Sequence, residues 1–450
     1  MTLISEAKRN LKRWQLYVGA LLSLAGYCAI GYFTQRHDTH QLVLLYILLW
    51  IPYAYFCLNA ESGDLKILLI LGLLCRLSLF FSIPTLSDDF YRFIWDGRLL
   101  SQGIHPFTHL PSYYIEIEQA IPGINETLFE MLNSKGYFTI YPPVCQFIFS
   151  MAALVAPDSI IGSVMVIRTF IGGAEIGSIF LILKLIGIYK LPTRNVLLYA
   201  LNPLVILELT GNLHFEALMV FFSLAAIYYL KKKRQAMSAI MLALAVASKL
   251  LPLIYLPLVY KRVGASRFTK YIIITLLFSL LLFSPLLTID LIKGMQKSLV
   301  LYFQKFEFNA SIYYLLRQLG FWILGFNTIT YLGIGLAIIT FAAILYYTVY
   351  ERKTRQLLPE AMLMVNLIYL LFATTVHPWY IIPLLALGAV SQIRFQVVWS
   401  FIIFFTYVGY SSTGFRELYW IVWAEYLIAI GYLLYEIAWL NSKPPSGTAD

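Results

Sequence analysis

The stretch "LSLFFSIPTLSDDFYRFIWDGR", residues 77–98, joins an apolar segment directly to a charged one. Its last twelve residues hold five charged side chains, whereas only 12% of the whole chain is charged. The apolar part ends a run at 65–83 that is long enough to cross the hydrocarbon core of a membrane, about 30 Å thick. Two adjacent aspartates, Asp88 and Asp89, therefore follow directly on a predicted membrane span.

Similar apolar runs recur along all 450 residues, and 60% of the chain is hydrophobic. Runs of roughly 18–22 apolar residues are typical of membrane-spanning helices, and the short alternating segments of a membrane barrel do not occur. The sequence predicts an all-α polytopic membrane protein with about 12–14 crossings. The predicted spans are 14–34, 42–58, 65–83, 160–183, 196–211, 213–230, a proline-broken pair at 236–260, 269–289, 329–349, 358–376, 378–392, 395–411 and 418–439.

Basic stretches set the predicted orientation, because Lys and Arg collect in cytoplasmic loops. They lie at 1–14, 231–234, 260–267 and 350–355. The first stretch has no cleavage site and is interpreted as a cytoplasmic anchor. The net charge of +10 is explained by these loops, so we expect no nucleic-acid partner.

With these stretches inside, both termini are predicted to be cytoplasmic in one transmembrane domain covering 1–450. Two segments then fall outside: a first large loop at 84–141, expected to fold against the membrane, and a second loop at 290–328. The run 142–156 is short for a crossing at about 1.5 Å per residue. We expect it to lie in the outer leaflet or to insert only partly.

Polar residues from three distant parts of the sequence are predicted to lie on the outer side. Ionisable groups at a membrane rim are energetically costly, so each is a candidate for function. These residues are Asp88, Asp89, Glu208, Asn212, His214, Glu216 and His377. Helix capping and turn polarity are the alternative for residues 202–216.

A helix over 88–98 would place Asp88, Arg92 and Asp96 on one face, at i, i+4 and i+8. Arg92 is then predicted to pair with a carboxylate, with the acidic residues Asp88 and Asp89 as its expected partners. The alternative is an interfacial helix with a solvated stripe of ion pairs.

Isolated polar residues elsewhere leave two interpretations open. Lys249 either snorkels to the interface or contacts an anionic headgroup such as a lipid phosphate. His377 lies beside Trp379 and Tyr380, which are ordinary interface aromatics or substrate contacts. Arg168 and Glu175 are expected to form structural ion pairs with neighbouring helices.

Six blocks of sequence resemble, in their order, integral-membrane glycosyltransferases of the GT-C fold. The resemblance is to the bacterial mannosyltransferase-like group, which is related distantly to the catalytic subunit of GPI mannosyltransferase I. The blocks are "DDFYRFIWDGRLLSQGIHPF" (88–107), "YPPVCQ" (141–146), "LNPLVILELTGNLHFEAL" (201–218), "ASKLLPLIYLP" (247–257), "FNASIYYLLR" (308–317) and "HPWYIIPLL" (377–385).

The resemblance implies a GT-C bundle whose first large outer loop carries the catalytic acid motif on short interfacial helices. The donor would be a polyprenyl-phosphate sugar, often mannose, and Asp88 or Asp89 would be catalytic. The motif is adjacent Asp-Asp instead of Asp-x-Asp and follows three spans instead of one. The implied enzyme lies in the plasma (inner) membrane, with its active site on the periplasmic or extracellular side.

Inverting sugar transfer requires a carboxylate to accept the proton of the acceptor hydroxyl. It also requires stabilisation of the departing phosphate, for which Lys249, Arg92 and Arg317 are the candidates. No metal ligands are assigned, and a divalent cation such as Mg²⁺ or Mn²⁺ is an open alternative. The candidate substrate-contacting residues are Asp96, Arg98, His105, Tyr141, Glu208, Asn212, His214, Glu216, His377, Trp379 and Tyr380.

The acceptor stays open between a glycan, a lipid-linked intermediate and a protein side chain. A transporter or lipid flippase is the first competing hypothesis, but it should carry charges near the membrane midplane and often shows inverted repeats. A polysaccharide polymerase or ligase is the second. Such enzymes usually carry their large outer loop late in the chain.

Overall fold

A computed structural model describes residues 12–117, 120–351 and 357–442, and in these ranges the regular secondary structure is helical apart from one small hairpin and one isolated bridge between Phe308 and Thr375. Most of the basic stretch at 1–14, and residues 352–355 of the basic stretch at 350–355, lie outside the described ranges. The architecture confirms the prediction of an all-α polytopic membrane protein.

Six helices in the described ranges are long and apolar enough to cross a membrane. They are α1 (Arg13–Phe33), α2 (Thr39–Asn59), α8 (Ile160–Tyr189), α14 (Ala265–Phe283), α17 (Ile329–Tyr350) and α21 (Tyr419–Ser442). A bent pair adds a seventh span if its two halves are counted together. The predicted 12–14 crossings are reached only if shorter helices cross as well.

Shorter apolar helices fill the space between the long ones. They are α7 (Pro143–Val155), α12 (Gln235–Ser248), α18 (Leu358–Phe372), η5 (Pro378–Ile381) with α19 (Ile382–Ala389), and α20 (Phe395–Ile402) with η6 (Ile403–Gly409). The remaining elements of the bundle are α3 (Leu65–Ser78), η1 (Thr193–Val196), α9 (Leu197–Ala200), η3 (Leu251–Tyr255), α13 (Leu256–Val263), η4 (Ser284–Leu286), α15 (Ile289–Lys305), α16 (Ile312–Leu324) and the strands β1 (Tyr410–Ser411) and β2 (Gly414–Phe415).

The bent pair joins α10 (Pro203–Val205) and η2 (Ile206–Gly211) to α11 (Glu216–Lys231) through a bend of 114°. Asn202 begins the first half, since its side chain accepts hydrogen bonds from two backbone amides of the first turn. Leu213 has a φ of 64°, an unfavourable value for a branched residue. The bend collects the polar residues of 208–216 in one turn.

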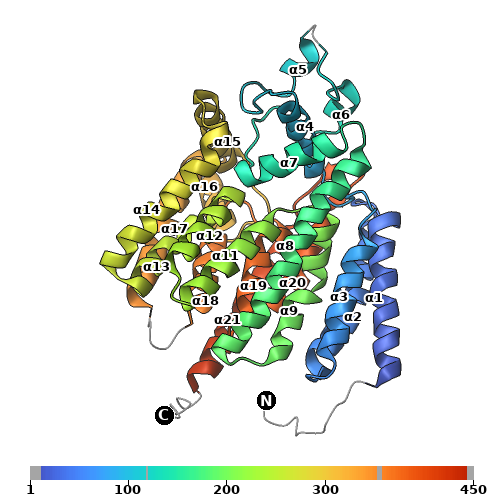
Figure 1. The fold of residues 1–450 in the computed structure, drawn as a ribbon, viewed down its shortest axis with the longest axis vertical. Coiled ribbons are helices and arrows are strands. Elements are labelled where there is room, and N and C mark those ends of the chain that lie inside the picture. The colour runs from blue at the N-terminus through green and yellow to red at the C-terminus, as the bar shows by residue number, and fades with distance from the viewer. Residues whose placement is uncertain (1–11, 118–119, 352–356, 443–450) are drawn as a thin grey trace.

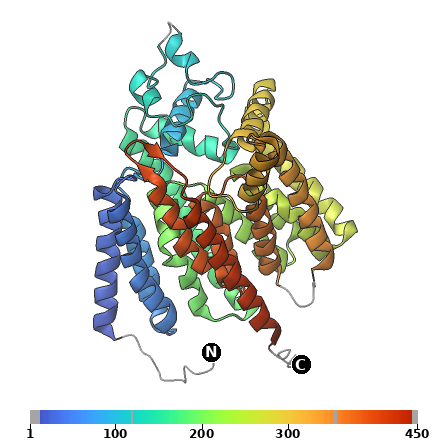
Figure 2. The ribbon, with the colours of Figure 1, turned by 180° about the vertical axis from the view of Figure 1, so that it is seen from behind.

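The segment 84–141 folds into α4 (Asp89–Ser101), α5 (Tyr113–Glu116) and α6 (Glu126–Glu130) and gathers at one end of the bundle (Figure 1). We call this the loop end. The helix α7 lies across it, and its 13 residues are too few to cross about 30 Å at 1.5 Å per residue. The first residues of α1 and the last residues of α21 lie at the opposite end (Figures 1 and 2).

Three buried charged residues join elements within the bundle. Glu175 of α8 pairs with Arg76 of α3 at 2.8 Å, and both side chains are at most 4% exposed. This confirms the ion pair expected for Glu175. Arg168 instead donates to backbone carbonyls, among them those of Thr210 and Ser82, so it fixes the segment that follows α3 against the bent pair.

Candidate active site

The adjacent aspartates Asp88 and Asp89, here called the acidic pair, lie at the start of α4. Asp88 is the N-cap residue and Asp89 begins the helix. The guanidinium of Arg36, from the connection between α1 and α2, donates to Asp88 Oδ2 at 2.7 Å. The Arg36 side chain is 29% exposed and that of Asp88 is 39% exposed. Asp88 therefore has a cationic partner at the protein surface.

Asp89 has a different set of partners. The Asn133 amide donates to Asp89 Oδ1 at 2.7 Å, and the Tyr141 hydroxyl lies 3.5 Å from Oδ2. Burial raises the pKa of the Tyr141 phenol well above its usual value, and the charge of Asp89 raises it further. Tyr141 is therefore a neutral donor at physiological pH. In the described chain, Asp88 and Asp96 form the salt bridges of this helix, whereas Asp89 forms none.

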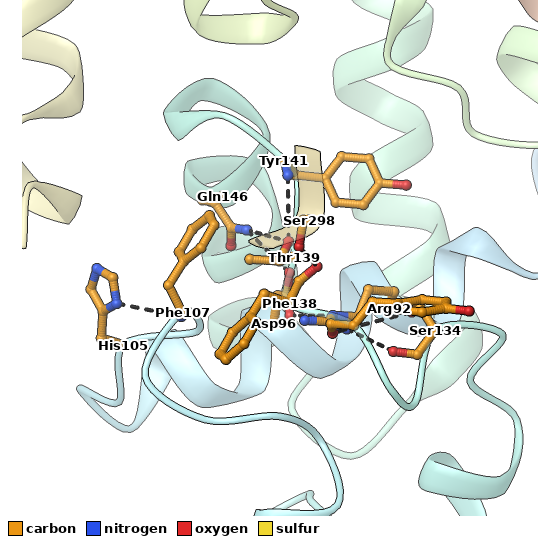
Figure 3. Close-up of polar contacts among 11 residues, drawn as sticks. Arg92, Asp96, His105, Phe107, Ser134, Phe138, Thr139, Tyr141, Gln146 and Ser298 are labelled. Carbon is orange, nitrogen blue, oxygen red and sulfur yellow. Dashed lines mark hydrogen bonds and ion pairs between the residues drawn. The ribbon is translucent and has the colours of Figure 1, made fainter. Parts of the chain in front are cut away.

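Arg92 does not pair with the acidic pair, contrary to the prediction. Its Nε donates to Asp96 at 2.7 Å, one turn further along α4, and both side chains are buried (Figure 3). The same guanidinium donates to the carbonyls of Ser134 and Tyr137, at 3.2 and 2.8 Å. Arg92 therefore holds the loop before α7. Its Nε and Nη1 donate to protein groups, and the assignment of Arg92 to a phosphate stays a prediction.

Asp96 continues this network into α7. Gln146 Nε2 donates to Asp96 at 3.1 Å and to the Thr139 hydroxyl at 3.2 Å (Figure 3). The i, i+4 spacing therefore predicted that Arg92 and Asp96 share one face of α4, but not that they pair with each other. The network holds the segment 134–141, at whose end Tyr141 reaches Asp89.

A second cluster of polar side chains lies at the turn of the bent pair and is centred on Glu208. The Tyr407 hydroxyl donates to Glu208 Oε1 at 2.8 Å, and the Asn212 amide donates to Oε2 at 3.1 Å. His214 Nδ1 lies 2.9 Å from the Glu208 carbonyl oxygen and 3.2 Å from Oε2. Glu208, Asn212 and His214 are all buried. These bonds join side chains inside an apolar bundle, so helix capping alone does not explain the polar residues of this turn.

Aromatic rings connect this turn to the segment around residue 377. The His214 ring stacks on Trp379 at a centroid distance of 3.7 Å, and Trp379 stacks on His377 at 4.4 Å. The Phe308 ring also packs on His377, at a centroid distance of 4.6 Å. Burial lowers the pKa of His377 to about 3, and the charges of His214 and Lys249 lower it further. His377 is therefore a neutral ring at physiological pH.

Lys249 follows the last residue of α12 and forms an ion pair with Glu216 at the beginning of α11. The lysine side chain is 32% exposed and the glutamate side chain is 4% exposed. The ammonium lies 4.3 Å from the centroid of the Tyr380 ring, a distance at which a cation is attracted to the aromatic face. The structure thus brings together three predicted residues from three separate segments.

Three other predicted residues make their polar contacts elsewhere in the described chain. Arg98 donates to the Gly123 carbonyl at 2.6 Å, and His105 Nε2 lies 3.0 Å from the Leu286 carbonyl (Figure 3 shows His105). Arg317 pairs with Glu307 at 2.7 Å. These contacts hold local structure, and the assignment of the three residues to substrate stays a prediction.

Sequence reasoning missed Arg36, Asn133, Tyr407 and Tyr410. The ring of Tyr410 lies under the Arg36 guanidinium, 4.5 Å away. One signal could have identified Arg36, because the predicted topology puts the end of the span at 14–34 on the same side as the acidic pair. In the described ranges, no group of three or more His, Cys, Asp or Glu side chains is arranged to hold a metal ion.

The chain is similar in sequence to known mannosyltransferases. Residues 6–263, more than half of the chain, match the family described as "Alpha-(1->6)-mannopyranosyltransferase, N-terminal domain". The chain is also 28% identical over 205 residues to Alpha-(1->6)-mannopyranosyltransferase A of Corynebacterium glutamicum. That match covers 45% of this chain and 40% of the relative. The predicted resemblance to bacterial GT-C mannosyltransferases is confirmed, and the chain belongs to the alpha-(1->6)-mannopyranosyltransferase family.

Proposed function

We propose that this membrane protein is a mannosyltransferase that moves mannose from a polyprenyl-phosphate donor to an acceptor hydroxyl at the loop end. The observation that carries the proposal is the acidic pair. Two adjacent carboxylates lie at the start of α4, and their partners differ: a cation for Asp88 and neutral donors for Asp89. Family membership supports mannose as the sugar.

In the proposed reaction, the acceptor oxygen attacks the anomeric carbon of the donor. The bond between that carbon and the phosphate oxygen breaks, and a carboxylate of the acidic pair takes the hydroxyl proton. Polyprenyl phosphate leaves with the electron pair of the broken bond, and Lys249 stabilises its charge. If the product is α-linked, as in the name of the relative, inversion requires a β-linked donor.

The proposed reaction takes place on the outer side of the membrane. The helix α8 begins beside α7 at the loop end, and Lys190 and Arg194 follow its last residue. Basic residues mark the cytoplasmic side, which supports placing the loop end on the periplasmic or extracellular side. Cysteine-accessibility labelling of Lys232→Cys and Thr127→Cys, both at exposed positions, tests this, and labelling from the same side would contradict it.

A transfer assay tests the function. The purified protein in lipid nanodiscs receives polyprenyl-phosphate β-mannose and a panel of glycan, lipid and peptide acceptors, and released polyprenyl phosphate is measured. We expect release only with an acceptor present, and loss of release by about 100-fold or more in Asp88→Asn/Asp89→Asn. A nucleotide-activated mannose serves as the control donor. Parallel reactions with EDTA show whether a divalent cation is required.

Three outcomes would overturn the proposal. Turnover with the nucleotide sugar alone would exclude a lipid donor. Full activity of the double variant would exclude the acidic pair. Movement of the intact lipid-linked sugar across the bilayer, without release of polyprenyl phosphate, would indicate a flippase.

A further inference from the structure

We infer that Arg36 assigns different roles to the two aspartates: it neutralises Asp88 and thereby leaves Asp89 as the general base. The inference rests on the proposed function, and within it names the base and a positioning residue. Arg36 touches neither sugar nor phosphate in this role and acts only through Asp88.

The location of Arg36 is fixed by its own segment. Thr34 donates to the Ala29 carbonyl at 2.9 Å, and Gln41 donates to the Thr34 hydroxyl at 3.0 Å. The backbone N–H of Gln35 donates to the Asp38 carboxylate at 2.9 Å. These contacts close the short connection between α1 and α2, so Arg36 is presented from an ordered turn.

Arg36 joins three segments that are far apart in the sequence. It donates to Asp88 at 2.7 Å, lies 3.5 Å from the Leu86 carbonyl, and covers the Tyr410 ring at 4.5 Å. The hairpin that carries Tyr410 lies beside the segment 84–141 in the rear view (Figure 2). A planar guanidinium is suited to such a position, because it can donate to a carboxylate and stack on an aromatic face together.

The two carboxylates consequently differ in their availability for a proton. Asp88 Oδ2 accepts from the cationic Arg36 guanidinium at 2.7 Å, so this oxygen already has a fixed partner. Asp89 accepts from Asn133 through Oδ1, whereas the contact of its Oδ2 with the Tyr141 hydroxyl is long, at 3.5 Å. Asp89 Oδ2 is therefore the oxygen best placed to accept a proton from a hydroxyl group.

Several other titratable groups lie around the acidic pair. Tyr91 lies within the field of Asp88, and Tyr141 lies within that of Asp89. Burial is the main cause that raises the pKa of Tyr410 to about 12. The charge of Arg36 opposes this shift, and the charges of Asp88, Asp89 and Glu208 add to it. These phenols are all neutral at physiological pH. Arg36 is therefore the cation that distinguishes the two aspartates in the described chain.

The experiment compares pH profiles of kcat in nanodiscs with polyprenyl-phosphate β-mannose. Asp89→Asn should lose about 100-fold or more in kcat, whereas Asp88→Asn should stay within about tenfold of the wild type. Arg36→Gln leaves Asp88 as an unpaired negative charge beside the base. The acid limb of the profile should then move to higher pH by about one unit. Asp88→Asn frees Arg36 to face Asp89, and the limb should move to lower pH.

Two further variants separate this role from simple support of the fold. Arg36→Gln/Asp88→Asn removes both charges of the pair, so its acid limb should return close to the wild-type position. Arg416→Gln removes an exposed arginine near the hairpin and should leave the profile unchanged. Thermal melting confirms that each variant is folded. If Arg36→Gln does not fold, Arg36→Lys replaces it in the test, because it keeps the charge and should keep the wild-type acid limb.

Each outcome has a distinct meaning. A larger loss in Asp88→Asn than in Asp89→Asn overturns the assignment of the base. An acid limb that does not move in Arg36→Gln, or that moves equally in Arg416→Gln, overturns the role of Arg36. Absence of polyprenyl-phosphate release by the wild-type protein overturns the proposed function itself, and the inference falls with it.

Discussion

Lys249 and Glu216 form an ion pair in which only the lysine reaches the protein surface. The Lys249 side chain is 32% exposed, whereas that of Glu216 is 4% exposed. The buried carboxylate thus holds the ammonium at the edge of the site, beneath the ring of Tyr380. A partly exposed lysine with a fixed position is suited to bind an incoming phosphate. The phosphate would share the Lys249 ammonium with Glu216.

We predict that Lys249→Met weakens binding of a polyprenyl-phosphate donor by roughly tenfold, because one charge-assisted contact is lost. The single variant also leaves Glu216 buried and unpaired, which by itself destabilises the protein. The double variant Lys249→Met/Glu216→Gln removes that problem. It should recover thermal stability while donor affinity, measured by titration calorimetry, stays low. Recovery of both quantities would mean that Lys249 only balances Glu216.

A second prediction concerns the ion pair between Arg76 and Glu175, which connects α3 to α8 inside the bundle. The Thr210 hydroxyl also donates to Glu175, so the carboxylate links three elements. Removing one partner of a buried pair leaves an uncompensated charge and costs about 3–5 kcal/mol. Arg76→Met should therefore lower the melting temperature strongly. Arg76→Met/Glu175→Gln should be more stable than either single variant, and additive losses would contradict this.

The helices of this protein could be predicted because an apolar run depends only on local sequence. The predicted spans at 14–34 and 329–349 correspond to α1 and α17 within one or two residues. The rule on basic loops then allocated each polar residue to one end of the bundle. Residues as distant as Glu208 and His377 could therefore be expected at the same end of the bundle.

The partners of the polar residues could not be predicted in the same way. Helical spacing showed that Arg92 and Asp96 share a face, but not that Ser134 and Tyr137 would occupy the same guanidinium. Arg36 lies 52 positions before Asp88, and no local pattern joins them. The stacked rings depend on a 114° bend that combines a π-helical turn with a left-handed leucine, and apolar periodicity contains no signal for either.

A third prediction follows from His377, whose pKa falls from an ordinary value near 6.5 to about 3 in the folded protein. The unfolded chain binds a proton below about pH 6.5, whereas the folded protein does not until about pH 3. Stability contributed by neutral His377 is therefore present above pH 6.5 and is lost as the pH falls. The expected slope is at most about 1.4 kcal/mol per pH unit.

Chemical denaturation at several pH values checks this effect. His377→Gln should flatten the decline in the free energy of unfolding between about pH 6.5 and pH 4.5. The matched control is His40→Gln, which removes an exposed histidine at the start of α2 and should leave the slope unchanged. A wild-type slope in His377→Gln would show that this ring is protonated in the folded protein.

The last prediction concerns Asn309, which is fully buried and has a φ of 46°. Its amide donates to both oxygens of Glu425 in α21 at 3.1 Å, and its carbonyl accepts from the Tyr426 hydroxyl at 2.8 Å. The next residue toward the N-terminus, Phe308, packs on His377. Asn309 therefore ties the last helix to the aromatic rings of the site.

Three substitutions separate the backbone and side-chain roles of Asn309. Asn309→Gly keeps the left-handed conformation and loses only the side-chain bonds to Glu425, at a cost of about 1.5–3 kcal/mol. Asn309→Ala adds about 1 kcal/mol of backbone strain. Asn309→Asp should melt lowest of the three, because a second carboxylate would face Glu425 in a buried site. Equal melting temperatures for the glycine and alanine variants would contradict the backbone argument, and an aspartate variant as stable as the wild type would contradict the contact with Glu425.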